Sequence, residues 1–477
     1  MDINIFNTET HKKELFKPIK HGHISMYHCG PTVYWTQHIG NMRAVVLADL
    51  MVRSLRYNDY KVTLVRNYTD VGHLSGDNEG DADAGTDRME KGAKREGVTP
   101  EEIANKYIAI YEKDISDLNV VPADFKPKAT AHIPEIIEMV ETLLKKGYAY
   151  ATPLAIYFDV KKAKDYGKLS GQDYKKNIMG AGSGDVADPA KHNHADFAIW
   201  FFRAGAHANA LQFWPSPFTS PLVENGNGFP GWHIECSAMS KKYLGPTLDI
   251  HMGGIEHIPI HHTNEIAQSE AANGVPFVHY WLHNEHLLVN GAKMSKSEGT
   301  SFSLAEIEEK GFDPLALRYF FMQSSYRSKQ NFTWEALQAA QSGLLSLYKQ
   351  VNALGTEKDG VDQHLKDDFA SALVDDFNMP KALATVSELL HADLPKAQKL
   401  STILDFDKVL GLNIEERANA LNQTERLPEE IQKLIAQRNT ARTEKNWQES
   451  DRLRDEIVKK GYEILDSSEG TKIKKKS

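Results

Sequence analysis

The feature that most constrains the fold is a strand–helix–strand pattern within the first 65 residues. Apolar and polar residues alternate over 24–28, as expected of a strand, and an apolar stretch over 61–65 indicates a second strand. Between them, apolar residues recur with the spacing of one buried helix face, at Ala48, Met51, Val52 and Leu55. A helix joining two strands at this spacing forms a βαβ unit. We therefore expect an α/β fold with a doubly wound parallel sheet, whose ligands bind beyond the carboxyl ends of the strands.

The chain has two cysteines, and each lies in a segment that can hold a metal ion. Cys29 follows the first predicted strand directly, and Cys236 lies far along the chain. A third segment places His261 and Glu265 four residues apart, hence on one face of a helix. Thiolate, imidazole and carboxylate together suit zinc, which accepts sulfur, nitrogen and oxygen ligands. The alternative is that each cysteine is a small buried hydrophobe, since these ligands come from distant segments.

The segment His38-Ile39-Gly40-Asn41 lies at the predicted beginning of the first helix. Gly40 allows a ligand to approach the backbone, while His38 and Asn41 offer hydrogen-bonding groups. A helix N-terminus attracts phosphate through its exposed N–H groups and positive dipole. The segment therefore favours a nucleotide site, although a capped helix with a surface histidine is the simpler alternative.

A second motif, which is basic, follows about 250 residues later and reads Lys293-Met294-Ser295-Lys296-Ser297. Two lysines on a loop can neutralise the charge that develops when a triphosphate is cleaved. A solvated basic turn is the alternative for this motif taken alone. Their occurrence together favours ATP chemistry.

Composition and charge limit the class of protein. A hydrophobic fraction of 41% and a charged fraction of 25% are ordinary for a soluble globular chain, and 477 residues predict several domains. We find no signal segment and no apolar run of membrane-spanning length, so we expect a cytoplasmic protein without membrane association. A net charge of −9 argues against general coating of nucleic acid, but it does not exclude recognition of one RNA.

Taken together, these motifs resemble those of class I aminoacyl-tRNA synthetases. Segments 29–34, 230–239 and 261–268 resemble the cysteinyl-tRNA synthetase family in particular, and the similarity extends from Phe6 to Thr471. The resemblance implies a Rossmann-like doubly wound catalytic domain with a connective insertion, an α-helical bundle and a small C-terminal anticodon-binding module. It also implies ATP-dependent activation of L-cysteine to cysteinyl-adenylate and transfer to tRNA(Cys).

The resemblance further implies a role for individual residues. It implies one zinc ion that selects the substrate thiolate, held by Cys29, Cys236, His261 and Glu265. ATP, with Mg²⁺, would be bound and activated by His38, Asn41, Lys293 and Lys296, with Gly253, Gly254 and Glu256 beside the adenosine. The cysteine substrate would be bound by Gly30, Thr69 and Trp232.

Domain boundaries follow from the same resemblance, and we expect a monomer. The expected parts are 1–127 and 211–270 for the catalytic domain, 128–210 for the insertion, 271–330 for the lysine-loop region, 331–422 for the helical bundle and 423–477 for the anticodon module. In the last module the expected RNA contacts are Arg438, Arg442, Trp447 and Arg454. A plain amphipathic helical hairpin with a basic tail is the alternative for this module.

Some positions depart from the family pattern, and two rival functions remain open. Trp35 stands where the family frequently has an acidic residue, Glu256 replaces the family's usual aspartate, and the acidic segment 70–92 is longer than expected. One rival is a ligase that joins cysteine to an amino sugar. The other is a non-catalytic relative that binds RNA.

Overall fold

The structure, a computed structural model, describes residues 2–74, 87–171, 188–294, 299–425, 428–443, 446–467 and 470–475. Contacts divide the chain into two compact units. The larger unit comprises Met1–Leu347 and Thr356–Asn413, and the smaller comprises Tyr348–Gly355 and Ile414–Ser477. Among the described residues, no helix combines the length and apolar character needed to cross a membrane.

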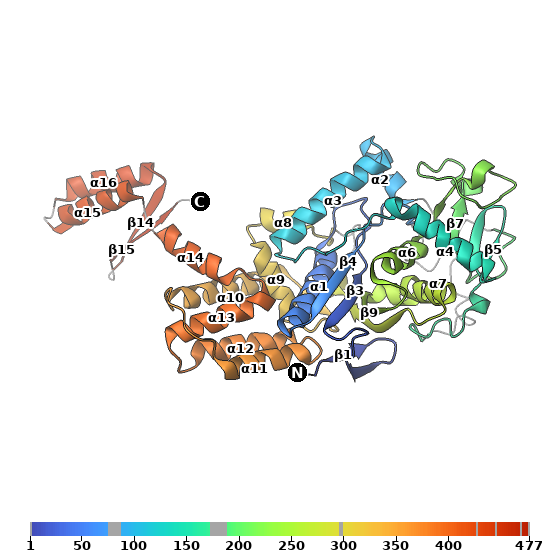
Figure 1. Ribbon diagram of the computed structural model, residues 1–477. Coiled ribbons are helices and arrows are strands. Elements are labelled where there is room, and N and C mark those ends of the chain that lie inside the picture. Colours follow the sequence, from blue (N-terminus) through green and yellow to red (C-terminus); the bar gives the residue numbers. More distant parts are fainter. Residues whose placement is uncertain are drawn as a thin grey trace. The chain divides into compact units, whose positions relative to one another are not determined.

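A four-stranded parallel sheet lies at the centre of the larger unit (Figure 1). Its spatial order is β10-β9-β3-β4, with β3 (His23–His28), β4 (Lys61–Arg66), β9 (Leu248–Gly254) and β10 (Val278–Asn284). The chain passes from β3 to β4 through α1 (Ile39–Tyr57), whereas β9 pairs with the opposite edge of β3. The strand order therefore reverses between β3 and β9, and a ligand crevice forms at their carboxyl ends. The predicted parallel α/β sheet is confirmed.

Helix α1 begins at Ile39, ahead of the periodic apolar residues that predicted it, because His38 caps its N-terminus. The backbone N–H of Asn41 donates to Nδ1 of His38, and the backbone N–H of His38 donates to Oδ1 of Asn41, each at 3.3 Å. Reciprocal bonds of this kind satisfy two of the helix's unpaired N–H groups. The first turn of α1 is thereby fixed at the carboxyl end of β3.

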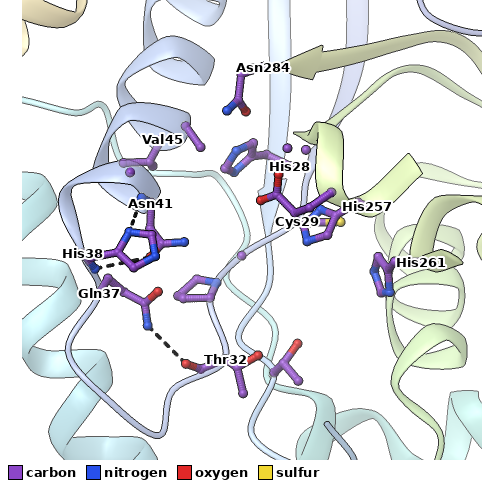
Figure 2. Close-up of a pocket in the computed structure, with 18 of the residues that line it drawn as sticks. His28, Cys29, Thr32, Gln37, His38, Asn41, Val45, His257, His261 and Asn284 are labelled. Atoms are coloured by element: carbon purple, nitrogen blue, oxygen red, sulfur yellow. Dashed lines mark hydrogen bonds between the residues drawn. The ribbon is translucent and has the colours of Figure 1, made fainter. Parts of the chain in front are cut away.

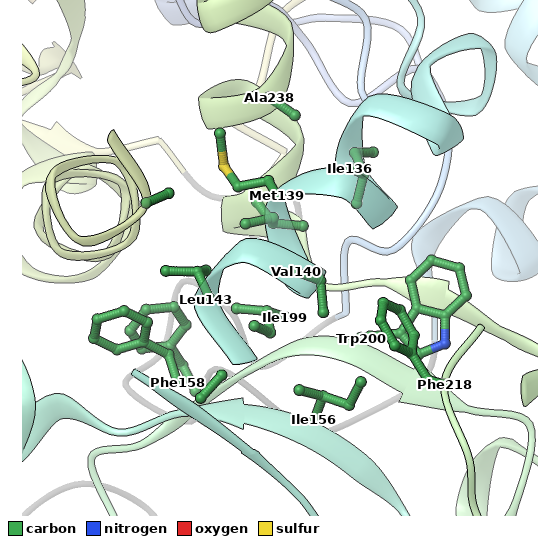
Figure 3. Packing of buried hydrophobic residues seen from close by; sticks show 14 of the residues in the cluster. Ile136, Met139, Val140, Leu143, Ile156, Phe158, Ile199, Trp200, Phe218 and Ala238 are labelled. Atoms are coloured by element: carbon green, nitrogen blue, oxygen red, sulfur yellow. The ribbon is translucent and has the colours of Figure 1, made fainter. Parts of the chain in front are cut away.

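In the connective insertion a helix covers an antiparallel sheet, and the apolar core between them extends to Ile234, Ala238 and Ala271 outside the insertion (Figure 3). The helix is α4 (Ile133–Lys145), and the sheet contains β5 (Ala149–Ala151), β6 (Ala155–Phe158), β7 (Phe197–Phe202) and β8 (Gly228–Pro230). Ile136, Val140 and Leu143 of α4 pack on the sheet, each contributing about 1.5–3 kcal/mol by burial. The expected boundary at residue 210 falls between β7 and β8, within this sheet. Two helices that carry site residues follow: α6 (Trp232–Leu244) and α7 (Thr263–Asn273).

The remaining elements of the larger unit surround this framework. The helices are α2 (Arg88–Glu96), α3 (Pro100–Asp117), α8 (Leu304–Glu309), α9 (Pro314–Met322), α10 (Trp334–Asn352, which ends in the smaller unit), α11 (Gln363–Val374), α12 (Met379–His391) and α13 (Lys396–Leu410). The short strands are β1 (Asn4–Asn7), β2 (Lys12–Leu15), β11 (Leu287–Val289), β12 (Ala292–Lys293) and β13 (Gln330–Phe332). A buried ion pair joins α9 to α1, with Nη2 of Arg318 2.6 Å from Oδ2 of Asp49. Burial alone would raise the pKa of Asp49, but the guanidinium groups of Arg318 and Arg53, with a hydrogen bond from the backbone N–H of Val121, together outweigh it and lower that pKa.

The smaller unit is a helical hairpin with an antiparallel β-hairpin. It contains α14 (Ile414–Glu425), α15 (Glu429–Thr443), α16 (Trp447–Lys459), β14 (Tyr462–Ser467) and β15 (Gly470–Lys475). Its core is a small cluster made by Ile431, Leu434, Leu453, Ile457 and Ile464. Among the described residues of this module, the cluster is small and offers little interior for a buried site.

Candidate active site and metal centre

Four predicted ligands from distant segments converge at the carboxyl ends of β3 and β9. Side-chain donor atoms of Cys29, Cys236, His261 and Glu265 all lie within 4.8 Å of one another. Donor atoms this close together can share one metal ion after small adjustments of the side chains, since zinc bonds to sulfur, nitrogen and oxygen are about 2.0–2.3 Å long. Cys29 is fixed because its backbone N–H donates to the carbonyl of Met252 in β9, at 3.2 Å.

An irregular helical turn delivers the histidine ligand. Residues Ile258–His262 form a π-helical turn that continues directly into α7. Such turns are rare in proteins, and those that occur are often found at functional sites. Here the turn places His261 and Glu265 side by side, with Nε2 of His261 2.8 Å from Oε1 of Glu265.

The chemistry of this group fits a metal ion. Glu265 is fully buried, yet neither carboxylate oxygen has a well-formed hydrogen bond to a described residue. Burial raises the pKa of Glu265 and of the Cys29 thiol, whereas a hydrogen bond from that thiol lowers the pKa of Cys236. A buried carboxylate without a well-formed hydrogen bond is costly, and a cation among the four donors removes that cost.

A second possible donor group shares two of these residues. His251 and His262 join Cys29 and Glu265 in a set that also lies within 4.8 Å. The Sγ of Cys29 is 3.3 Å from Nε2 of His251 and 3.4 Å from Nε2 of His262. Sequence reasoning did not single out these two histidines, although histidine is dense over 251–262. That density was the signal available.

The group of Cys29, Cys236, His261 and Glu265, the metal group, lies at one end of a cavity of about 400 Å³ (Figure 2). At the other end of this cavity lie His38 and Asn41, at the N-terminus of α1. Lys293 also lines the cavity, and the methyl end of Met294 lies where a Cβ of Gly40 would be. The lysine loop thus starts beside the helix N-terminus. Lys296 lies outside the described residues.

The glycines at the end of β9 leave space for neighbouring side chains. A Cβ at Gly253 would lie 2.6 Å from Cε1 of His262 and 2.7 Å from Nδ1 of His257. A Cβ at Gly254 would overlap the carboxylate of Glu256. The predicted residues Gly253, Gly254 and Glu256 all line the cavity. The space next to the two glycines is filled by the histidine and glutamate side chains just named.

The residues expected around the cysteine substrate also line the cavity. Gly30 packs so closely against the backbone carbonyl of Asn67 that a Cβ at position 30 would collide with it. Thr69 is buried beside it, and Trp232 stacks on His261 with ring centres 4.1 Å apart. His73, which sequence reasoning missed, stacks on Trp232 at the same distance.

The predicted RNA contacts of the smaller unit differ in exposure. Trp447 is 60% exposed and Arg454 is exposed, whereas Arg438 is only 3% exposed. Arg442 has intermediate exposure. Arg438 is therefore poorly placed for contact with RNA in this structure.

Comparison with known proteins identifies the family. Residues 15–342 match the family of class I (C) tRNA synthetase catalytic domains, and residues 424–472 match the anticodon-binding domain of cysteinyl-tRNA ligases. Cysteine–tRNA ligase 1 of Burkholderia lata is 41% identical over 476 residues, covering 99% of this chain and 97% of that protein. Cysteine–tRNA ligase of Treponema denticola is 38% identical over 505 residues, covering all of both chains.

A solved structure confirms the fold. Methionyl-tRNA synthetase of Mycobacterium tuberculosis, in complex with methionyl-adenylate, aligns with a TM-score of 0.54 at 13% identity, covering 83% of this chain and 91% of that one. This likeness concerns the fold alone. The family matches and the full-length relatives go further: the chain belongs to the cysteinyl-tRNA synthetase family of class I aminoacyl-tRNA synthetases.

Proposed function

We propose that the protein is a cysteine–tRNA ligase that activates L-cysteine with ATP and transfers it to tRNA(Cys). The observation that carries this proposal is one cavity with a thiolate-rich metal group at one end and His38 and Asn41 at the other. Full-length similarity to cysteine–tRNA ligases supports the same reaction. The match to an anticodon-binding domain favours tRNA over an amino sugar as acceptor.

We further propose that the metal is zinc, held by Cys29, Cys236, His261 and Glu265. Two thiolates make this set softer than the alternative with His251 and His262, and zinc accepts such ligands. When bound, zinc would supply a soft Lewis acid that ligates the substrate thiolate. Cysteine and serine differ by one atom, and a pocket that recognises only shape separates such substrates by about 1–3 kcal/mol.

The chain's own residues would position the reactants. The N-terminus of α1 would bind the phosphates of ATP, which we expect to carry Mg²⁺. Lys293, with Lys296, would neutralise charge on the departing pyrophosphate. The substrate carboxylate would attack the α-phosphorus, so catalysis is mainly alignment of the two substrates rather than proton transfer.

Pyrophosphate exchange tests the activation step. The protein should exchange pyrophosphate into ATP in the presence of cysteine and not of serine, and it should contain one zinc ion per chain. Absence of exchange by zinc-loaded protein, with and without tRNA, would contradict the proposal. Charging of tRNA(Cys) compared with an amino sugar then identifies the acceptor. Gel filtration tests the expected monomer.

A further inference from the structure

His257 lies in the cavity between the metal group and the nucleotide end. It has intermediate exposure and lines the same cavity as Cys29 and His38. Figure 2 shows it beside Cys29, on the side of the cavity where His261 lies. Its ring centre is 5.3 Å from that of His261 and 6.0 Å from that of Trp232.

The backbone of β9 makes room for this ring. Nδ1 of His257 would be 2.7 Å from a Cβ at position 253, so only glycine there leaves the ring its place. This nitrogen is buried and has no hydrogen-bond partner among the described residues. With Nδ1 enclosed, Nε2 on the other side of the ring is the nitrogen that a ligand in the cavity can reach.

The chemistry of the reaction predicts what reaches it. A thiolate bound at the metal group fixes one end of cysteine beside His261. The carboxylate must then extend toward His38 and Asn41, because it attacks the α-phosphorus of ATP. An imidazole N–H can donate a hydrogen bond to a carboxylate, and such charge-assisted bonds are stronger than neutral ones.

We propose that Nε2 of His257 donates a hydrogen bond to the carboxylate of the cysteine substrate and orients it for attack. This inference rests on the proposed function, since it assumes a thiol amino acid bound at the metal group. It assigns a second contact, to the carboxylate, for a substrate already held by its thiolate. His257 is thus a substrate-binding residue in addition to the predicted set.

Two substitutions at this position separate the hydrogen bond from the shape of the ring. His257→Leu removes both nitrogens while keeping an apolar side chain of similar reach. His257→Gln retains an amide N–H near the position of Nε2. His192→Leu is the matched control, because His192 stacks on Tyr150 in the insertion, with ring centres 3.6 Å apart, and does not line this cavity.

The measurement is calorimetric binding of three thiols to zinc-loaded protein. Cysteine has both charged groups, 3-mercaptopropionate lacks the amine, and cysteamine lacks the carboxylate. His257→Leu should weaken binding of the first two about 10- to 100-fold and leave cysteamine within about twofold. His257→Gln should recover most of the loss, and His192→Leu should bind all three like the wild type.

Several outcomes would overturn the inference. Equal weakening of all three thiols, or loss of zinc from His257→Leu, would mean that the ring supports His261 instead of the substrate. Unchanged binding of cysteine by His257→Leu would exclude the contact directly. If zinc-loaded wild type bound none of the thiols, the proposed function itself would fail, and this result is distinct from the others.

Discussion

The metal group and the C-terminal module place their functional side chains in opposite surroundings. In the metal group, Cys236, His261 and Glu265 are almost completely buried and come from separate elements of the larger unit. In the module, Trp447 and Arg454 are exposed on a single helix, α16, above a core of few residues.

This difference follows from what each region is expected to bind. Metal ligands and a small substrate require fixed donors shielded from water, which only a large core can hold in place. An RNA loop is itself a large ligand, and its bases stack on side chains that project from the surface. The larger unit should therefore determine amino-acid activation, and the smaller unit should determine RNA affinity.

Replacing a thiolate of the metal group should produce the largest effect. Four-ligand zinc sites bind with about 10–16 kcal/mol, so loss of one thiolate in Cys236→Ser should weaken zinc binding by about 100-fold or more. Cysteine-dependent pyrophosphate exchange should fall with zinc content, measured by atomic emission. His251→Asn should weaken zinc binding only about 10-fold, as expected of a residue that orients a ligand. A larger loss of zinc binding in His251→Asn than in Cys236→Ser would assign the metal to His251 and His262.

Removal of a loop lysine should reduce catalysis without changing the metal. Lys293→Ala should lower kcat for pyrophosphate exchange about 100-fold, because a charge that stabilises the departing pyrophosphate is lost. Zinc content and the KM for cysteine should stay near wild-type values. A change confined to KM would show that Lys293 binds the ground state instead.

Truncation of the exposed tryptophan should affect RNA alone. Stacking of a base on an aromatic side chain contributes about 1–3 kcal/mol, so Trp447→Ala should raise the KM for tRNA(Cys) about 10-fold. Pyrophosphate exchange measured without RNA should be unchanged. Equal loss in both assays would contradict the division of tasks between the two regions.

The smallest effect should distinguish the two arginines of the module. Arg454→Ala should weaken tRNA binding about threefold and reduce its salt dependence by about one phosphate contact. Arg438→Ala should instead lower the melting temperature of the protein, because Arg438 is buried. A salt-dependent loss of affinity in Arg438→Ala at unchanged melting temperature would reverse this assignment.

Sequence reasoning succeeded where spacing along the chain carries the information. The first βαβ unit and the parallel sheet follow from local periodicity, and both are confirmed. The resemblance to cysteinyl-tRNA synthetases is confirmed by the family matches. The assigned roles of individual site residues stay predictions, although the described ones expected in the larger unit line or adjoin one cavity.

The amino-acid sequence by itself determined the fold class and the family, and it supplied a set of candidate site residues. The tertiary structure decided which of them meet. Only the pairing of β9 with β3 brings Cys29 near residues more than 200 positions away, and only the π-helical turn places His261 beside Glu265. Local patterns specify strands and helices, but contacts between distant segments depend on strand order and backbone irregularities, which no spacing in the sequence reveals.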